Sequence, residues 1–255
     1  MALARLISRL DIKGPTLVKG VQLEGVRQLG RPEDFAAEYY SQGVDEIIYM
    51  DVVASLYNRN SLSEIVEWTA GRIFVPLTVG GGIRKPDDAM RLFRSGADKI
   101  SINTSAIRSP ALISDIAKIG GSQAVVVSIE AKSVGDSRWE ALIENGREPS
   151  GRDAVAWAQE AEQMGAGEIL LTSVDREGTR RGCDLELLRA VTSRVSVPVI
   201  YSGGVGKPED VVQAISQGGA SAVAMADVLH YKRFTLSQIR DVVQSAGIGV
   251  RPNHD

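Results

Sequence analysis

The sequence predicts an α/β fold, a single (β/α)8 barrel of the TIM type built from two homologous half-barrels, and three observations support this prediction. Eight short apolar runs alternate with longer segments that have helical spacing. The chain has 255 residues, close to the roughly 250 residues that are typical of such a barrel. A motif in the first half recurs about half a chain length later.

The predicted strands are runs rich in β-branched residues. In order along the chain they are Leu6–Ile12, Ile47–Val53, Val75–Val79, Ile100–Ile102, Ala124–Ile129, Ile169–Val174, Val197–Tyr201 and Ala222–Ala226. Continuous apolar runs are expected of parallel strands that are buried on both faces. Segments between them, such as 86–95 and 154–165, have helical spacing and end next to glycine, a common helix stop. No linker divides the chain, so residues 1–255 are predicted to form one domain.

The internal repeat is clearest in two glycine-rich segments. VPLTVGGGIRK occupies 75–85, and VPVIYSGGVGK occupies 197–207. Each is followed by proline and two acidic residues, and Glu46 corresponds to Glu168 at the same offset. A repeat of this length indicates two homologous halves rather than a solenoid of short units.

Two stretches are longer than ordinary loops. Residues 13–30 follow the first predicted strand, and 131–151 follow the fifth and contain the hairpin-turn signal Asn145–Gly146. Both would lie at the C-terminal face of the barrel, where long loops usually serve a functional site.

Composition excludes several functional classes. With 29 Lys+Arg against 32 Asp+Glu, the chain has no electrostatic reason to bind nucleic acid or an anionic membrane. No apolar stretch approaches the roughly 20 residues of a transmembrane helix, and Arg5 and Arg9 interrupt the N-terminal segment, unlike a signal peptide. The single cysteine, Cys183, suits a reducing, cytoplasmic location. His230 and His254 are too few for a histidine-rich metal site, so no metal or cofactor is expected.

Two carboxylates end strands on opposite sides of the predicted barrel. Asp11 ends the first strand and Glu130 the fifth, and catalytic groups of this fold lie at such strand ends. Two carboxyls facing each other can serve as general acid and general base if their surroundings separate their pKa values. The alternative is that they only anchor loop backbone.

Glycine clusters after the third and seventh strands predict two anion sites. The first consists of Gly80, Gly81 and Gly82, with Asn103 and Thr104 as added donors, and the second contains Gly203 and Gly204. Backbone N–H groups of such turns can cradle phosphate, and the paired arrangement suggests a ligand with a phosphate at each end. Asp227, equivalent to Thr104, would repel phosphate. It therefore either turns away, or this site takes another group.

Four charged residues stand at strand starts, at the opposite end of the barrel: Arg5, Glu46, Lys99 and Glu168. Taken alone, they are typical of a neutral salt-bridge layer that closes the barrel bottom. Lys19, in the long first loop, could close over an anionic substrate or could be a solvated lysine.

Eight segments together carry a family resemblance: LDIK at 10–13, VKGV at 18–21, VDEIIYMD at 44–51, TVGGGI at 78–83, GADKISINT at 96–104, GSQAVVVSI at 121–129, GAGEILLTSVDREGT at 165–179 and SGGVGK at 202–207. With them the chain resembles the cyclase subunits of imidazole glycerol phosphate synthase, which are (β/α)8 barrels. The resemblance implies that a HisH-like glutaminase docks at the barrel bottom and that ammonia passes a charged gate and the barrel interior. At the top it would react with a bisphosphorylated ribulosyl aminoimidazole carboxamide, giving imidazole glycerol phosphate and an aminoimidazole nucleotide.

The resemblance assigns roles to particular residues. It implies that Asp11 and Glu130 are catalytic and that Asp98 lies at the glutaminase interface. The implied gate residues are Arg5, Glu46, Lys99 and Glu168. The implied phosphate contacts are Gly82, Asn103, Thr104 and Gly204. The whole set of predicted substrate and phosphate contacts, which does not rest on the resemblance alone, comprises Lys19, Gly81, Gly82, Asn103, Thr104, Asp175, Gly178, Gly203, Gly204 and Asp227.

Four positions depart from the family pattern. The family has Asp at Glu130 and at Glu177, usually Cys at Arg9, and Ser at Asp227. Two hypotheses therefore stand: the cyclase of histidine biosynthesis, or a paralogue that channels ammonia to a sugar-amidating enzyme of surface-polysaccharide synthesis. A third, a phosphosugar-binding scaffold, would have no use for the retained gate.

Overall fold

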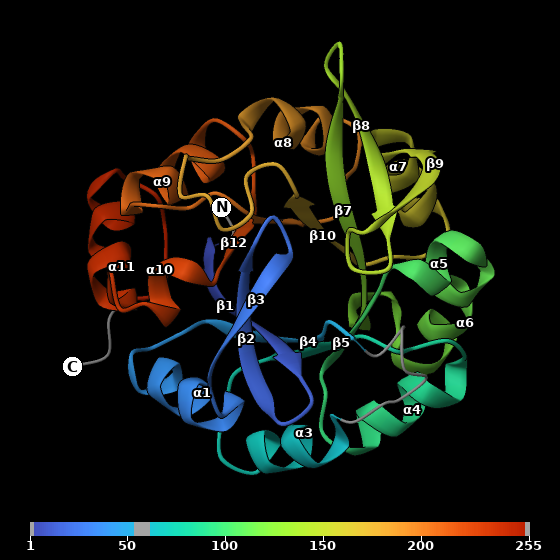
Figure 1. Ribbon diagram of the computed structural model, residues 1–255, viewed down its shortest axis with the longest axis horizontal. Helices are drawn as coiled ribbons and strands as arrows, with labels where there is room; N and C mark the ends of the chain where they lie inside the picture. Colours follow the sequence, from blue (N-terminus) through green and yellow to red (C-terminus); the bar gives the residue numbers. More distant parts are fainter. Residues whose placement is uncertain (1–2, 54–61, 253–255) are drawn as a thin grey trace.

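Eight parallel strands close into a barrel in the computed structural model, which describes residues 3–53 and 62–252 (Figure 1). In order around the barrel they are β1 (Arg5–Lys13), β4 (Glu46–Asp51), β5 (Leu77–Gly80), β6 (Lys99–Ile102), β7 (Val125–Gly135), β10 (Glu168–Ser173), β11 (Val199–Ser202) and β12 (Ala222–Met225). β12 pairs with β1 and so closes the ring. The predicted (β/α)8 barrel is confirmed.

The helices form an outer ring around the strands (Figure 1). They are α1 (Pro32–Ser41), α3 (Ser63–Ala70), α4 (Pro86–Arg94), α5 (Thr104–Arg108), α6 (Ala111–Gly120), α7 (Ala154–Gln163), α8 (Leu185–Thr192), α9 (Pro208–Ser216), α10 (Asp227–His230) and α11 (Leu236–Ser245), with a 3-10 turn, η1, at Ser122–Ala124. The repeat is visible in α4 and α9, each of which begins with proline followed by two acidic residues. Proline fits the first helical turn, and acidic side chains there stabilise the helix dipole.

Side chains alternate between two cores along each barrel strand. On β1, Leu6 and Leu10 pack in the core between strands and helices, whereas Ile7 packs inside the barrel. Ile48, Val126 and other inward-facing residues share that inner core with Ile7. Because β-strand side chains point alternately to opposite faces, Arg5, Ile7, Arg9 and Asp11 all face the barrel interior.

Residues 13–30 form an antiparallel hairpin rather than the expected loop. β2 (Thr16–Val21) pairs with the end of β1, and β3 (Glu24–Gly30) pairs with β2. The sequence did not predict this hairpin because the turn between β2 and β3 uses Gln22 and Leu23. Both residues have positive φ, a conformation for which glycine or asparagine is the usual sequence signal.

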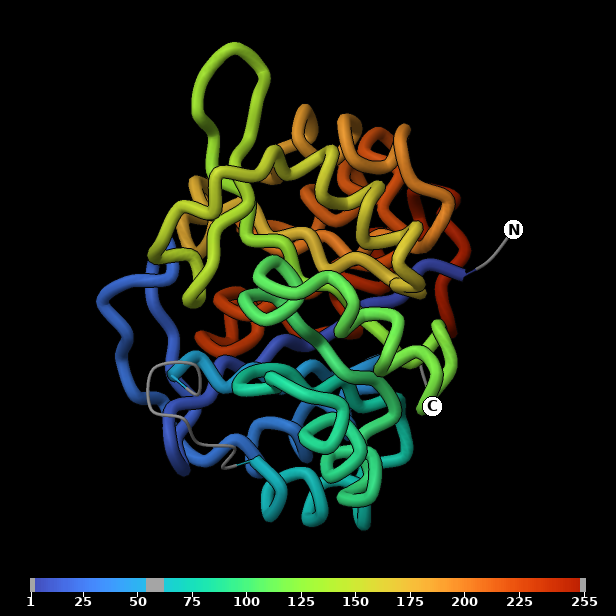
Figure 2. Tube along the Cα trace, turned by 90° about the vertical axis from the view of Figure 1, so that its right-hand side faces the viewer, coloured from blue at the N-terminus to red at the C-terminus, as the bar shows by residue number. Residues whose placement is uncertain are grey.

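Residues 131–151 also continue the sheet. β7 extends to Gly135 and pairs with β8 (Arg138–Ile143), which pairs with β9 (Glu148–Asp153). The predicted turn at Asn145–Gly146 is confirmed, with φ of 58° and 76°. Figure 2 shows the tip of the β7–β8 hairpin projecting well beyond the barrel. Within the described residues, no helix combines the length and apolarity that a bilayer crossing requires.

Candidate functional site

A closed ring of four charges lies at the N-terminal end of the barrel. Arg5 Nη1 donates to Glu46 Oε1 at 2.5 Å, and its Nη2 donates to Glu168. Lys99 Nζ lies 3.1 Å from the second oxygen of Glu46 and 2.9 Å from that of Glu168. Each cation thus bridges both carboxylates, and both carboxylates are buried. The structure therefore brings all four predicted residues into one neutral constellation.

The opposite end of β1 and β7 carries the two predicted catalytic carboxyls. Asp11 accepts a hydrogen bond from Arg9 Nε at 2.9 Å. Glu130 accepts from Ser128 Oγ at 2.8 Å and also from the Asn103 side-chain amide. Burial raises the pKa of Glu130, although the nearby Arg9 guanidinium opposes this shift. The two carboxyls therefore have different surroundings, as an acid–base pair requires.

Lys19 is buried on β2 and forms an ion pair with Glu177, while its Nζ also donates to the Gly20 carbonyl at 2.8 Å. Burial lowers the pKa of Lys19, but the Glu177 carboxylate outweighs that effect and raises it. The reading of Lys19 as a solvated lysine is wrong, because the hairpin turns the side chain inward. The same ion pair gives Glu177 a defined partner. In the sequence, Glu177 stood out only because it departs from the family pattern.

A pocket of about 150 Å³ opens between the ends of β4, β5, β6 and β7. Its lining includes Gly81, Gly82, Asn103, Thr104, Arg108, Glu130 and Glu144. A Cβ on Gly81, at φ 101°, would lie 2.4 Å from the Asp51 carbonyl oxygen, so only glycine fits. The first predicted anion site is thus a real concavity beside Glu130. Sequence reasoning missed Arg108 and Glu144, which pair at 3.1 Å across it.

The second predicted site has a different charge pattern. Gly203 and Gly204 both have positive φ, at 109° and 82°. Asp227 Oδ1 lies 2.9 Å from Arg233 Nε and 3.8 Å from Arg180 Nε. Asp227 is therefore turned toward two guanidinium groups, which neutralise the repulsion that the sequence predicted. Neither arginine was foreseen, because both lie in connecting segments without a regular spacing.

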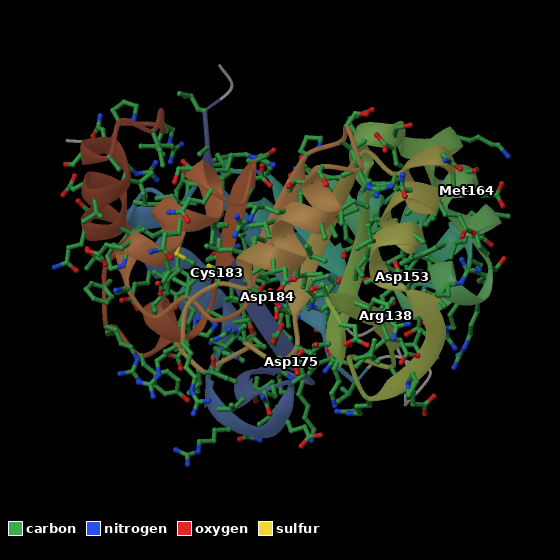
Figure 3. All side chains as sticks on the ribbon, turned by 90° about the horizontal axis from the view of Figure 1, so that it is seen from above. Arg138, Asp153, Met164, Asp175, Cys183 and Asp184 are labelled. Atoms are coloured by element: carbon green, nitrogen blue, oxygen red, sulfur yellow. The ribbon has the colours of Figure 1, made fainter. Side chains whose placement is uncertain are left out.

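Asp175 and Gly178 hold the two hairpins in place. Asp175 Oδ2 accepts from the Ser133 N–H at 2.8 Å, and the Asp175 carbonyl accepts from Gln22 at 3.2 Å. Figure 3 shows Asp175 next to the blue β2–β3 hairpin. A Cβ on Gly178 would lie 2.7 Å from the Gly20 carbonyl oxygen, so β2 packs directly on this glycine.

Other titratable groups do not join these sites. Burial raises the pKa of the Cys183 thiol to about 12, so it is not a ready nucleophile. Burial lowers the pKa of His230 to about 3, and its Nδ1 lies 2.6 Å from the Tyr39 hydroxyl. The part of the chain that the structure describes contains no group of three or more His, Cys, Asp or Glu residues able to hold a metal ion.

Asp98 lies at the N-terminal end of the barrel, in a depression lined mainly by apolar residues. Its Oδ2 accepts from the Leu77 N–H at 2.8 Å. Phe74, which also lines the depression, is 78% exposed. The other lining residues are Ala70, Ile73, Val75, Pro76, Leu77 and Gly96.

Comparison with known proteins identifies the family. Residues 5–235 match the family model described as "Histidine biosynthesis protein". The chain is 62% identical over 210 residues to the imidazole glycerol phosphate synthase subunit HisF of Legionella pneumophila, covering 82% of this chain and 99% of the relative. The chain belongs to the HisF family. It is also 47% identical to HisF of Myxococcus xanthus over 251 residues, 98% of this chain and 99% of the relative.

Membership of the HisF family favours the first of the two functional hypotheses. Both relatives are named imidazole glycerol phosphate synthase subunit HisF, and the matching family model is described as a histidine biosynthesis protein, so the polysaccharide paralogue is not favoured. The departures at Arg9, Glu130, Glu177 and Asp227 cluster instead at the barrel mouth, where each has a charged or hydrogen-bonding partner.

Proposed function

We propose that this chain catalyses ring closure with ammonia at the barrel mouth, using Asp11 and Glu130 as its acid–base pair. Its relatives are subunits of imidazole glycerol phosphate synthase, and the chain is the cyclase subunit of that lyase-type enzyme of histidine biosynthesis. Forming an imidazole ring from ammonia requires that N–H protons be removed and that leaving oxygen and nitrogen atoms be protonated. The observation that carries the proposal is the position of two buried carboxyls in different surroundings on opposite strands.

The surroundings suggest which carboxyl donates a proton. Burial raises the pKa of Glu130, so this group retains its proton to a higher pH than an exposed glutamate. We assign proton donation to Glu130 and proton removal to Asp11. Asp11 accepts a charge-assisted hydrogen bond from the Arg9 guanidinium, a partner that suits a carboxylate acting as a proton acceptor.

Two anion sites would hold the phosphorylated substrate. The pocket beside Glu130 offers Gly81, Gly82, Asn103 and Thr104 for one phosphate. Gly203 and Gly204, with Arg180 and Arg233 nearby, are proposed to hold the other. Positive-φ glycine turns expose backbone N–H groups to an anion, and guanidinium groups add charge-assisted hydrogen bonds.

Ammonia is proposed to enter at the opposite end. A HisH-like glutaminase would dock on the N-terminal face, over the depression that contains Phe74 and Asp98. The ring of Arg5, Glu46, Lys99 and Glu168 would then be the gate that ammonia crosses. Exposed aromatic side chains are typical of interface anchors. The single cysteine, Cys183, is compatible with work in the reducing cytoplasm.

The test is turnover of the bisphosphorylated substrate with ammonium alone, without a glutaminase. Loss of general acid–base catalysis typically costs about 10²- to 10⁴-fold, so Asp11→Asn should lower kcat by that order. Asp136→Asn, on the β7–β8 hairpin tip, is the matched control and should leave kcat unchanged. Absence of turnover by the wild-type chain at high ammonium would refute the proposal, and so would failure to complement a strain that lacks the histidine cyclase.

Partner docking has its own test. Phe74→Glu should weaken association with the glutaminase, measured by titration calorimetry, because a charge replaces an apolar contact. Ile119→Glu is the control, since Ile119 is exposed on α6 outside the depression. Equal affinity of Phe74→Glu and wild type would place the partner elsewhere.

A further inference from the structure

Arg9 is a buried cation in the barrel interior. It lies two residues before Asp11 on β1, on the same face of the strand. Its side chain is 2% exposed. β1 is hydrogen-bonded to β4, β12 and β2, but the Arg9 guanidinium reaches Thr172 on β10, which is not a neighbour of β1. The guanidinium therefore extends across the inside of the barrel.

Two hydrogen bonds fix the guanidinium there. Nε donates to Asp11 Oδ1 at 2.9 Å, and Nη1 donates to Thr172 Oγ1 at 2.9 Å. Nη2 is buried without a partner among the described residues. The orientation of the Arg9 guanidinium thus depends on two acceptors, the Asp11 carboxylate and the Thr172 hydroxyl. Of these two, only the Thr172 hydroxyl is uncharged.

The same guanidinium lies between the two proposed acid–base carboxyls. Thr172 is the register partner of Glu130 in the β7–β10 pair. The carboxylates of Asp11, Glu177 and Glu130 all attract the Arg9 guanidinium. The bond to Arg9 occupies Oδ1 of Asp11, and so fixes the plane of a carboxylate that otherwise rotates about χ2.

We propose that Arg9 is a positioning residue of the reaction, holding Asp11 in its reactive orientation through a strap across the barrel from Asp11 to Thr172. This inference rests on the proposed function of Asp11 as the group that removes protons. The substrate phosphates are held elsewhere, by the glycine turns, so the strap acts on the chemical step rather than on substrate binding.

Two substitutions test the strap by different routes. Thr172→Val keeps the shape and the charge of the region but removes the anchor of Nη1. Arg9→Lys keeps the charge but cannot bond Asp11 and Thr172 at once. Misplacement of a reacting group by about 1 Å can cost on the order of 10²-fold. Each variant should therefore lower kcat with saturating ammonium by about ten- to a hundredfold, with KM for the bisphosphorylated substrate unchanged.

Arg240→Lys is the matched control. Arg240 is likewise buried and paired with a carboxylate, Asp45 at 3.2 Å, but it lies on α11, away from the mouth. We expect both lysine variants to lose thermal stability, because each change disturbs a buried ion pair, but Arg240→Lys should keep the wild-type kcat. A comparable loss of kcat in Arg240→Lys would mean that unspecific destabilisation is the cause and would overturn the inference.

A double-mutant cycle decides between positioning and a separate structural role. If Arg9 acts through Asp11, then Arg9→Lys should have little further effect on kcat in the Asp11→Asn background. Additive losses, or wild-type kcat in both Arg9→Lys and Thr172→Val, would overturn the inference while leaving the proposed function intact. Failure of the wild-type chain itself to turn over would instead count against the proposed function.

Discussion

Glu130 is the residue whose surroundings most constrain its chemistry. It is buried at the edge of the pocket, and burial raises its pKa even though the Arg9 guanidinium opposes that shift. The Ser128 hydroxyl and the Asn103 amide both donate to it. Ionising a carboxyl in these surroundings costs folding stability. Such a loss is common at functional sites that need a group with a shifted pKa.

This cost predicts a pH-dependent stability. A carboxyl whose folded-state pKa is raised contributes its full stability below the unfolded pKa of about 4.3 and loses it as pH rises through the folded value. Glu130→Gln removes that dependence. The variant's free energy of unfolding, measured by urea titration, should therefore improve relative to wild type between pH 4 and pH 8, values on either side of the reference pKa. Glu140→Gln, on β8, is the control, and a parallel pH dependence of all three proteins would contradict the prediction.

The second anion site yields a prediction about affinity. Asp227 occupies the guanidinium groups of Arg233 and Arg180, so Asp227→Ser should free both for phosphate. Hydrogen bonds to charged groups contribute about 1.5–3 kcal/mol, and we expect the bisphosphorylated ligand to bind about tenfold more tightly by calorimetry, near the lower end of that range.

The exposed Asp136, on the hairpin tip, provides the control for that experiment. Asp136→Ser makes the same chemical change far from the site and should leave affinity unchanged. Weaker binding by Asp227→Ser would show that Asp227 orients the arginines for the ligand rather than competing with it.

Residue positions on regular strands were predictable, whereas partners from loops were not. Strand parity and the repeat place Asp11, Glu130 and the four ring residues correctly, because a period of two fixes which face a side chain takes. The same parity puts Arg9 beneath Asp11, a signal that was available in the sequence. Arg180 and Arg233 carry no such periodicity, so only the folded chain shows that they meet Asp227.

At the scale of elements, two strands of the barrel continue beyond it as hairpins. β1 leads into β2 and β3, and β7 leads into β8 and β9. The Asn145–Gly146 pair predicted the turn between β8 and β9. The turn between β2 and β3 instead has Gln22 and Leu23 at positive φ, residue types that rarely indicate a turn. The hairpins matter because β2 buries Lys19 against Glu177 and packs on Gly178.

The packing of β2 on Gly178 predicts that alanine at this position and alanine at Gly135 will have different effects on β2. Gly178 and Gly135 both have positive φ, 70° and 88°, but a Cβ meets the Gly20 carbonyl at 2.7 Å only in Gly178. Alanine at positive φ destabilises by more than about 1 kcal/mol. Gly178→Ala should in addition displace β2, seen as faster hydrogen exchange in residues 16–21. Gly135→Ala should leave that exchange unchanged, and equal exchange in both variants would contradict the prediction.

At the scale of the whole molecule, the barrel separates two chemical environments along one axis. The charged ring lies where the strands begin, and the acid–base carboxyls lie where they end. The apolar runs and the internal repeat were sufficient to predict this architecture because a closed parallel barrel needs eight buried strands. The loop residues that pair with groups at the mouth, such as Arg180 and Arg233 beside Asp227, are seen only in the three-dimensional structure.

This separation predicts that damage to the ring uncouples the two ends without harming the mouth. Lys99→Ala leaves Arg5 as the only cation between Glu46 and Glu168 within the ring. In the complex with a glutaminase, we expect glutamine-driven turnover to fall relative to glutamine hydrolysis, while ammonium-driven kcat of the free chain stays at the wild-type level. Lys118→Ala, which breaks an exposed pair with Asp115, should change neither rate. An equal fall in both reactions of Lys99→Ala would mean that the ring serves only to hold the barrel together, because a pure stability role cannot distinguish the source of the ammonia.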